Sequence, residues 1–151
     1  MVSTKLCPMI HHSLNNMETL FNSRRTFKFL AYTVSHCSLL LRSMMKFPDQ
    51  DHYSEDNSYN IDIEFWAVTY INIPALLSSI SIRQISDNRL PQYINRRFLI
   101  HNEKIFEIQS GEEKYYIIAG GLLIGTNRWE KEDRIFNYDL NLEHDEVVIS
   151  V

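Results

Sequence analysis

The run from Tyr59 to Ile85, YNIDIEFWAVTYINIPALLSSISIRQI, constrains the fold more than any other part of the chain. Between residues 61 and 71 every second residue is apolar or small, and successive side chains of a strand point to opposite faces. We therefore predict a half-buried strand over residues 60–72, which Pro74 ends because it has no amide hydrogen to donate. Residues 79–85 are predicted to form a strand that pairs antiparallel with it.

Short β-rich runs also occupy the rest of the chain. Residues 104–109 and 114–119 flank a short connection that contains Gly111, which is typical of a hairpin. No segment has the apolar spacing of an amphipathic helix over eleven or more residues. The other expected strands are residues 26–35, 39–44, 98–100, 122–124 and 146–151.

This order of elements predicts a mainly β protein, because strands follow one another without intervening helices. We expect an antiparallel sheet that forms a small sandwich or a partly open barrel, with little helix. The expected divisions are a loose N-terminal extension, a β-rich domain, and an acidic, partly ordered C-terminal region, at residues 1–24, 25–125 and 126–151. A polar loop is expected at residues 46–59.

Composition places the chain among ordinary globular proteins. It has 151 residues and a formal net charge of −4, with 44% hydrophobic residues, so one domain with a real core is expected. The first 46 residues carry six basic side chains against Glu18, which is too sparse for nucleic-acid binding. Cys7 and Cys37 make no disulfide framework, and no apolar run is long enough for a signal peptide or a membrane span. A soluble cytoplasmic protein is predicted.

Asp62 and Glu64 are the first candidates for function, because both lie on the same face of the strand over residues 60–72. A carboxylate pair on a rigid strand is how many hydrolases hold an acid and a base. The alternative is the exposed polar face of a half-solvated sheet. Arg42 ends the run Leu39–Leu41 and is expected to reach either acid from a neighbouring strand.

The turn that holds His36 and Cys37 is the second candidate, since an imidazole beside a thiol favours a nucleophile. Adjacent strand residues face opposite ways, however, which favours a small buried Cys and a hydrogen-bonded His at a turn. The acidic residues 49–56 lack the order and the glycine of a calcium loop, and the six histidines are scattered. No metal and no cofactor are predicted.

These observations favour a protein that binds another protein, of the kind that serves as a bacterial immunity or accessory protein. The predicted contact surface is the outer face with Asp62, Glu64, Trp66 and Tyr70, next to Arg42. Charge reversal at both acids is expected to weaken partner capture and to leave thermal melting nearly unchanged. A small hydrolase that uses Asp62 and Glu64 or the His36–Cys37 turn is one alternative, and a β-barrel with an apolar cavity for a small ligand is another.

Overall fold

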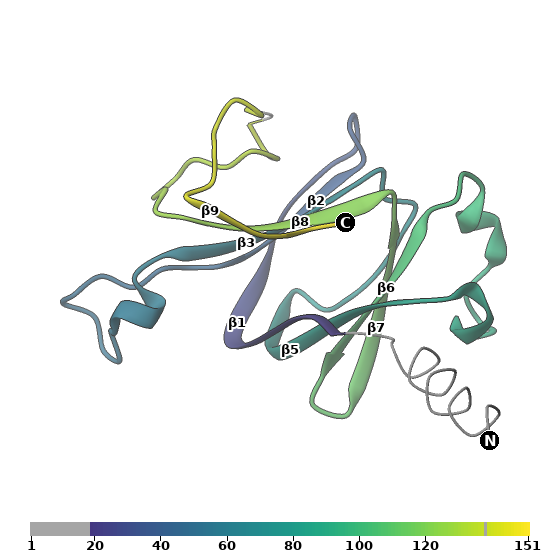
Figure 1. Ribbon diagram of the computed structural model, residues 1–151, viewed down its shortest axis with the longest axis horizontal. Coiled ribbons are helices and arrows are strands. Elements are labelled where there is room, and N and C mark those ends of the chain that lie inside the picture. The colour runs from purple at the N-terminus through teal and green to yellow at the C-terminus, as the bar shows by residue number, and fades with distance from the viewer. Residues whose placement is uncertain (1–18, 138) are drawn as a thin grey trace, which may run out of the picture.

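The computed structural model describes residues 19–137 and 139–151, and the chain is mainly β, as predicted. Nine strands of this part form one antiparallel sheet that is not closed into a barrel (Figure 1). Three short 3-10 turns, at Glu55–Asn57, Asp87–Arg89 and Arg96–Leu99, lie in the connections. The strands are β1 (Thr19–Thr33), β2 (Ser38–Ser43), β3 (Asn60–Trp66), β4 (Tyr70–Asn72), β5 (Leu76–Ile85), β6 (Lys104–Ser110), β7 (Glu113–Ala119), β8 (Gly121–Asn127) and β9 (Glu146–Ser150).

The strand order in the sheet is β4-β7-β6-β5-β1-β2-β3-β8-β9. The hairpin formed by β6 and β7 and the edge strand β9 are confirmed. The predicted pairing of residues 79–85 with the preceding strand is wrong, because β2 and β8 occupy both edges of β3. Strand β5 lies between β1 and β6 instead. The strand expected at residues 98–100 is also wrong, since a 3-10 turn covers Arg96–Leu99.

A sharp corner divides the strand that was expected over residues 60–72. Ala67 has a φ of 52°, and the Gly120 N–H donates to the carbonyls of Trp66 at 2.8 Å and Ala67 at 3.2 Å. Beyond the corner the Thr69 N–H donates to the Ile118 carbonyl at 2.8 Å. The ladder between β3 and β8 therefore continues around the corner as the ladder between β4 and β7, and the sheet folds over on itself.

Strand β1 is long enough to serve both halves of the folded sheet. Its residues from Thr19 to Lys28 pair with β5, and those from Lys28 to Thr33 pair with β2. The register with β5 shifts between Ser23 and Thr26, where the strand bends. Residues 19–24 therefore belong to the sheet and not to a loose extension, while residues 1–18 lie outside the described part of the chain.

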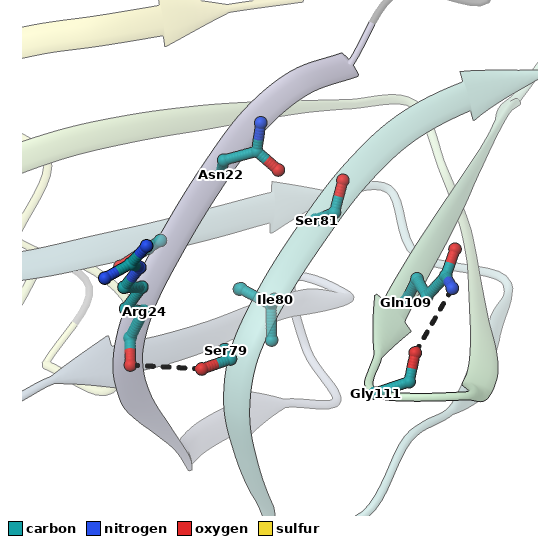
Figure 2. Close-up of a pocket in the computed structure, with 8 residues that line it drawn as sticks. Asn22, Arg24, Ser79, Ile80, Ser81, Gln109 and Gly111 are labelled. Carbon is teal, nitrogen blue, oxygen red and sulfur yellow. Dashed lines mark hydrogen bonds between the residues drawn. The ribbon is translucent and has the colours of Figure 1, made fainter.

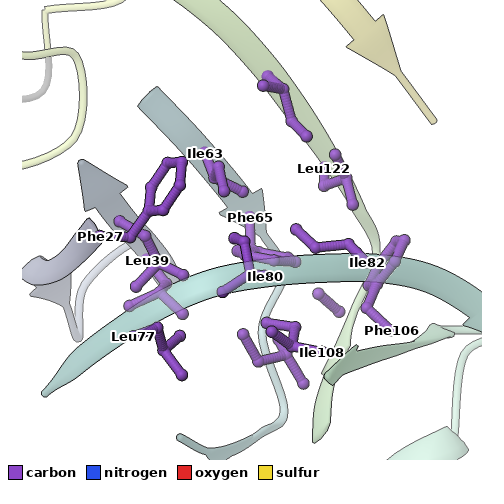
Figure 3. Close-up of a cluster of buried hydrophobic side chains, with 14 of the residues drawn as sticks. Phe27, Leu39, Ile63, Phe65, Leu77, Ile80, Ile82, Phe106, Ile108 and Leu122 are labelled. Carbon is purple, nitrogen blue, oxygen red and sulfur yellow. The ribbon is translucent and has the colours of Figure 1, made fainter. Parts of the chain in front are cut away.

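The main core lies between the two halves of the folded sheet (Figure 3). Phe65 of β3 meets Phe106 of β6 edge to face, with ring centroids 5.5 Å apart. The alternating inward positions of β3, β5, β6 and β8 supply most of this core, as a half-buried strand requires. The fully buried members include Phe27, Leu39, Ile63, Phe65, Ile82, Phe106, Ile108, Ile117, Ala119, Leu122 and Ile124.

Two irregular segments cover parts of the opposite, outer face of the sheet. Residues 86–103 place Leu90 and Ile94 against Ile105 of β6. Residues 128–137 and 139–145, which we call the C-terminal cover, place Ile135 against Leu40 of β2. The C-terminal region, which was expected to be partly ordered, thus covers the outer face of β2, β3 and β8.

Candidate functional site

The two carboxylates singled out in the sequence share the outer face of β3, but that face is not exposed. Asp62 is fully buried and Glu64 is 5% exposed, because the C-terminal cover lies over them. The predicted exposure of this surface is therefore wrong. Charge reversal at these positions places like charges in a buried site, so we expect it to lower the melting temperature, contrary to the expectation from the sequence.

The predicted reach of Arg42 to an acid on a neighbouring strand is confirmed. Arg42 lies directly opposite Asp62 in the ladder between β2 and β3. Its Nε and Nη2 donate to the two carboxylate oxygens at 2.6 and 2.8 Å, and both side chains are at most 2% exposed. Nη2 also donates to the Glu132 carbonyl at 3.0 Å, so this buried ion pair ties the C-terminal cover to the sheet.

A chain of hydrogen bonds beside this pair fixes the tautomer of His144. The Met45 N–H donates to Asn60 Oδ1 at 2.8 Å, so Asn60 presents its amide nitrogen to Asn127 Oδ1, also at 2.8 Å. Asn127 must then turn Nδ2 towards His144 Nδ1, 3.2 Å away, which makes Nδ1 an acceptor. The proton of the neutral ring is on Nε2, and it is donated to Glu64 at 2.9 Å.

The imidazole ring of His144 packs into the space that Gly125 leaves on the sheet. A Cβ on Gly125 would come within 2.7 Å of His144 Cδ2, so only glycine leaves room for the ring at this place in β8. The Trp129 ring packs on His144 with the centroids 5.0 Å apart and the planes tilted by 32°. The His144 side chain is completely buried, which makes it an anchor for the end of the C-terminal cover.

The charges of this cluster balance, and this bears on metal binding. One ligand atom each from Asp62, Glu64 and His144 lies within 4.8 Å of the others, which is close enough to hold an ion. However, Arg42 pairs with Asp62, and Arg134 Nε lies 3.4 Å from Glu64. A divalent cation would therefore add two uncompensated charges to a buried site. The contacts that these groups make hold the C-terminal cover to the sheet.

The other residues predicted from the sequence do not gather with these acids. His36 and Cys37 lie in the turn between β1 and β2, where Cys37 has a φ of 50°. Cys37 is exposed, so its expected burial is wrong. Trp66 is at the corner after β3 and is 42% exposed. Tyr70 is half-buried and packs on Phe98, with ring centroids 5.3 Å apart. The predicted contact surface therefore does not exist as one patch.

A cleft of about 610 Å³ opens between the first residues of β1 and the ends of β3, β8 and β9. Apolar side chains line this cleft together with two arginines and two acids. Because neighbouring strand residues face opposite ways, Ile61 and Thr126 line this cleft while Asp62 and Asn127 enter the buried cluster behind it. The lining residues are Phe21, Asn22, Ser23, Arg25, Tyr59, Ile61, Thr126, Arg128, Asp145, Glu146 and Val148.

A second depression, of about 510 Å³, lies on the surface between β1, β5 and the hairpin of β6 and β7 (Figure 2). Ser79, with a φ of 55°, donates to the Arg24 carbonyl at 3.4 Å, and Gln109 donates to the Gly111 carbonyl at 3.2 Å. Two of its polar side chains thus bond to the backbone, and it is smaller than the first cleft, which is the better candidate for a ligand.

Sequence reasoning missed His144, Asn127 and the cleft. Nothing in the local sequence around His144 distinguishes it from a solvated residue of an acidic segment. Its role depends on the pairing of β3 with β8, which are separated by more than fifty residues. The cleft depends in turn on the bend in β1 and on the position of β9 beside β8. The alternation of residues along one strand therefore does not predict it.

No family model, no curated protein and no solved structure matches this chain. In the described part of the chain, no helix has the length and the apolar character needed to cross a membrane.

Proposed function

We propose that this protein works by binding, and that it takes an extended segment of another protein into the cleft between β1 and β9. The cleft is the observation that carries this proposal, because it is larger than the depression beside β5 and combines apolar side chains with two arginines and two acids. A few polar groups around an apolar surface are the usual make-up of a binding site.

The edge of the sheet favours an extended occupant. Strand β9 is the last strand beside β8, and Val147 and Val148 are each about half exposed on it. An unpaired edge strand can accept a further strand through its backbone. A register shift lies between Ile124 and Gly125 opposite Val148 and interrupts the regular ladder, which limits this pairing to a short segment.

Burial of the acid–base groups favours binding over hydrolysis. Asp62 is held by Arg42 and Glu64 by His144 of the C-terminal cover, and Arg42, Asp62 and Glu64 are all buried. The alternative of a barrel with an internal ligand cavity finds little support, since the interior is filled by packed side chains. The exposed free thiol of Cys37 suits a reducing compartment, which supports a cytoplasmic location. An immunity or accessory protein is one kind of protein that acts in this way.

Selection from a displayed library of random peptides tests the proposal. The immobilised wild-type protein is expected to enrich peptides that lose binding to Val148→Lys, because a charge then lies on the apolar wall of the cleft. Val34→Lys is the matched control, since Val34 is 81% exposed in the turn at the far end of β1. Peptides that bind both variants as well as wild type, or no enrichment in repeated selections, would count against the cleft.

A further inference from the structure

The guanidinium of Arg25, which lines the cleft, is held by groups that carry no charge. Its Nε donates to Ser43 Oγ at 2.9 Å, and its Nη2 donates to the carbonyls of Tyr59 at 2.7 Å and Ser43 at 3.1 Å, with a longer contact to Met44. The guanidinium also lies over the Tyr59 ring, 5.2 Å from its centroid. The side chain is therefore held in one place without a counter-ion.

Donor capacity remains on this guanidinium. Nη1 has two N–H groups and a single contact, a 3.5 Å approach to the Asp56 carbonyl. Among the described residues no carboxylate forms an ion pair with Arg25, whereas Arg42, Arg83 and Arg134 each have one. Burial also lowers the pKa of the Arg25 guanidinium, which means that the surroundings disfavour its charge. An anion in the cleft would offset that cost.

A second arginine lines the same cleft. Arg128 follows β8, is exposed, and has no hydrogen-bond or ion-pair partner in the part of the chain that the structure describes. Asp145 and Glu146 line the cleft at the start of β9 and pair with neither arginine. A cleft that is lined by arginines and by acids suits an occupant that carries both signs of charge, as polypeptides do.

We propose that Arg25, together with Arg128, receives a carboxylate of the bound segment. This inference rests on the proposed function and names the chemistry of the occupant. The Nη1 group, whose only contact is the long one to the Asp56 carbonyl, can donate to a carboxylate oxygen, and a rigid guanidinium loses little side-chain entropy on binding. The carboxylate is either that of an Asp or Glu side chain or that of a chain terminus.

Four pools of acetylated random hexapeptides test the inference by isothermal titration. One pool is amidated and has no acidic residue, the second has one fixed Glu, the third has a free terminal carboxylate, and the fourth has one phosphoserine. We expect the second or the third pool to bind about tenfold more tightly than the first. The stronger of these two identifies the source of the carboxylate, and the Nε–H resonance of Arg25 should shift on its addition.

Two variants and a control separate recognition from folding. Arg25→Gln should remove the tenfold preference, and Arg128→Gln should reduce it about threefold while leaving the melting temperature unchanged, because Arg128 has no partner to lose. Arg24→Gln is the matched control, since Arg24 neighbours Arg25 on β1 but lines the other depression. It should keep the full preference.

The outcomes distinguish this inference from the proposed function. Equal binding of the neutral and the acidic pools, unaffected by either arginine variant, overturns the carboxylate assignment and leaves a neutral segment in the cleft. Much tighter binding of the phosphoserine pool than of the Glu pool also overturns it, in favour of phosphate. If no pool binds, the proposed function fails as well.

Discussion

His144 anchors the C-terminal cover on the outer face of β3. His144 comes from a segment that reads as solvated charge, yet its ring lies on Gly125, under Trp129, and donates to Glu64. The pair of Arg42 and Asp62 could be predicted, because both positions lie on strands with clear alternation. The partner of Glu64 could not, since no local pattern tells which residue of an irregular segment returns to the sheet.

Gly125→Ala should lower the free energy of unfolding by about 2 to 3 kcal/mol, because the new methyl group displaces the His144 ring and its buried hydrogen bonds. Urea denaturation measures the change. Gly111→Asn is the control: Gly111 has a φ of 62°, which Asn tolerates, and open space around it. Equal stability of Gly125→Ala and wild type would show that the ring is not seated on the glycine.

Arg42→Met should cost about 3 to 5 kcal/mol of unfolding free energy, since it leaves the Asp62 carboxylate buried without its partner. The double variant Arg42→Met/Asp62→Leu should recover much of that loss, because no unpaired charge remains. A double-mutant cycle by urea denaturation gives both values. A double variant that is less stable than Arg42→Met would show that the unpaired Asp62 carboxylate is not the main cause of the stability lost in Arg42→Met.

Tyr116 gives a prediction for alkaline pH. Burial, and then the Glu107 carboxylate to which its hydroxyl donates, raise the pKa of Tyr116 from 10.0 to about 12. The unfolded chain therefore loses this proton first, and the free energy of unfolding falls as the pH rises from about 10 to 12. Tyr116→Phe should fall less steeply over that range in urea denaturation. Glu107→Gln should keep part of the steep fall in unfolding free energy, because the burial of Tyr116 remains. Identical pH dependence of the unfolding free energy in Tyr116→Phe and wild type would refute the raised pKa of Tyr116.

At the scale of elements, local signals were reliable and distant ones were not. The β6–β7 hairpin follows from a short connection with Gly111 between two β-rich runs. The partner of β5 could not be read from the chain, because it depends on which edges of β3 are already taken. The corner at Ala67 was missed for a similar reason: alternation continues through it in the sequence, while the backbone turns.

The C-terminal cover should open as one element when its anchor is removed. His144→Ala is expected to raise the hydrogen-exchange rate of the amides of residues 130–145, since the ring and its contact with Glu64 are lost. The amides of β5 and β6 should keep their protection, because the cover does not contribute to the main core. Faster exchange throughout the sheet would mean that the cover is part of the folding core rather than an addition to it.

At the scale of the whole molecule, the fold buries the two acids of the predicted contact surface and leaves a cleft open elsewhere. The acids chosen from the sequence hold the C-terminal cover, and the cleft is lined by residues of β1, β3, β8 and β9, which lie far apart in the sequence. The mainly β class follows from the pattern of short strands. The position of the cleft follows only from the folding of the sheet upon itself, which no single segment encodes.

The most direct test of the binding site is the map of backbone amide shifts in two-dimensional NMR spectra as a selected peptide is added. The account predicts that the largest shifts fall on Phe21, Ser23, Tyr59 and Val148, around the cleft. Shifts that centre on Trp66 and Tyr70, with the cleft amides unchanged, would place binding at the corner of the sheet and contradict it.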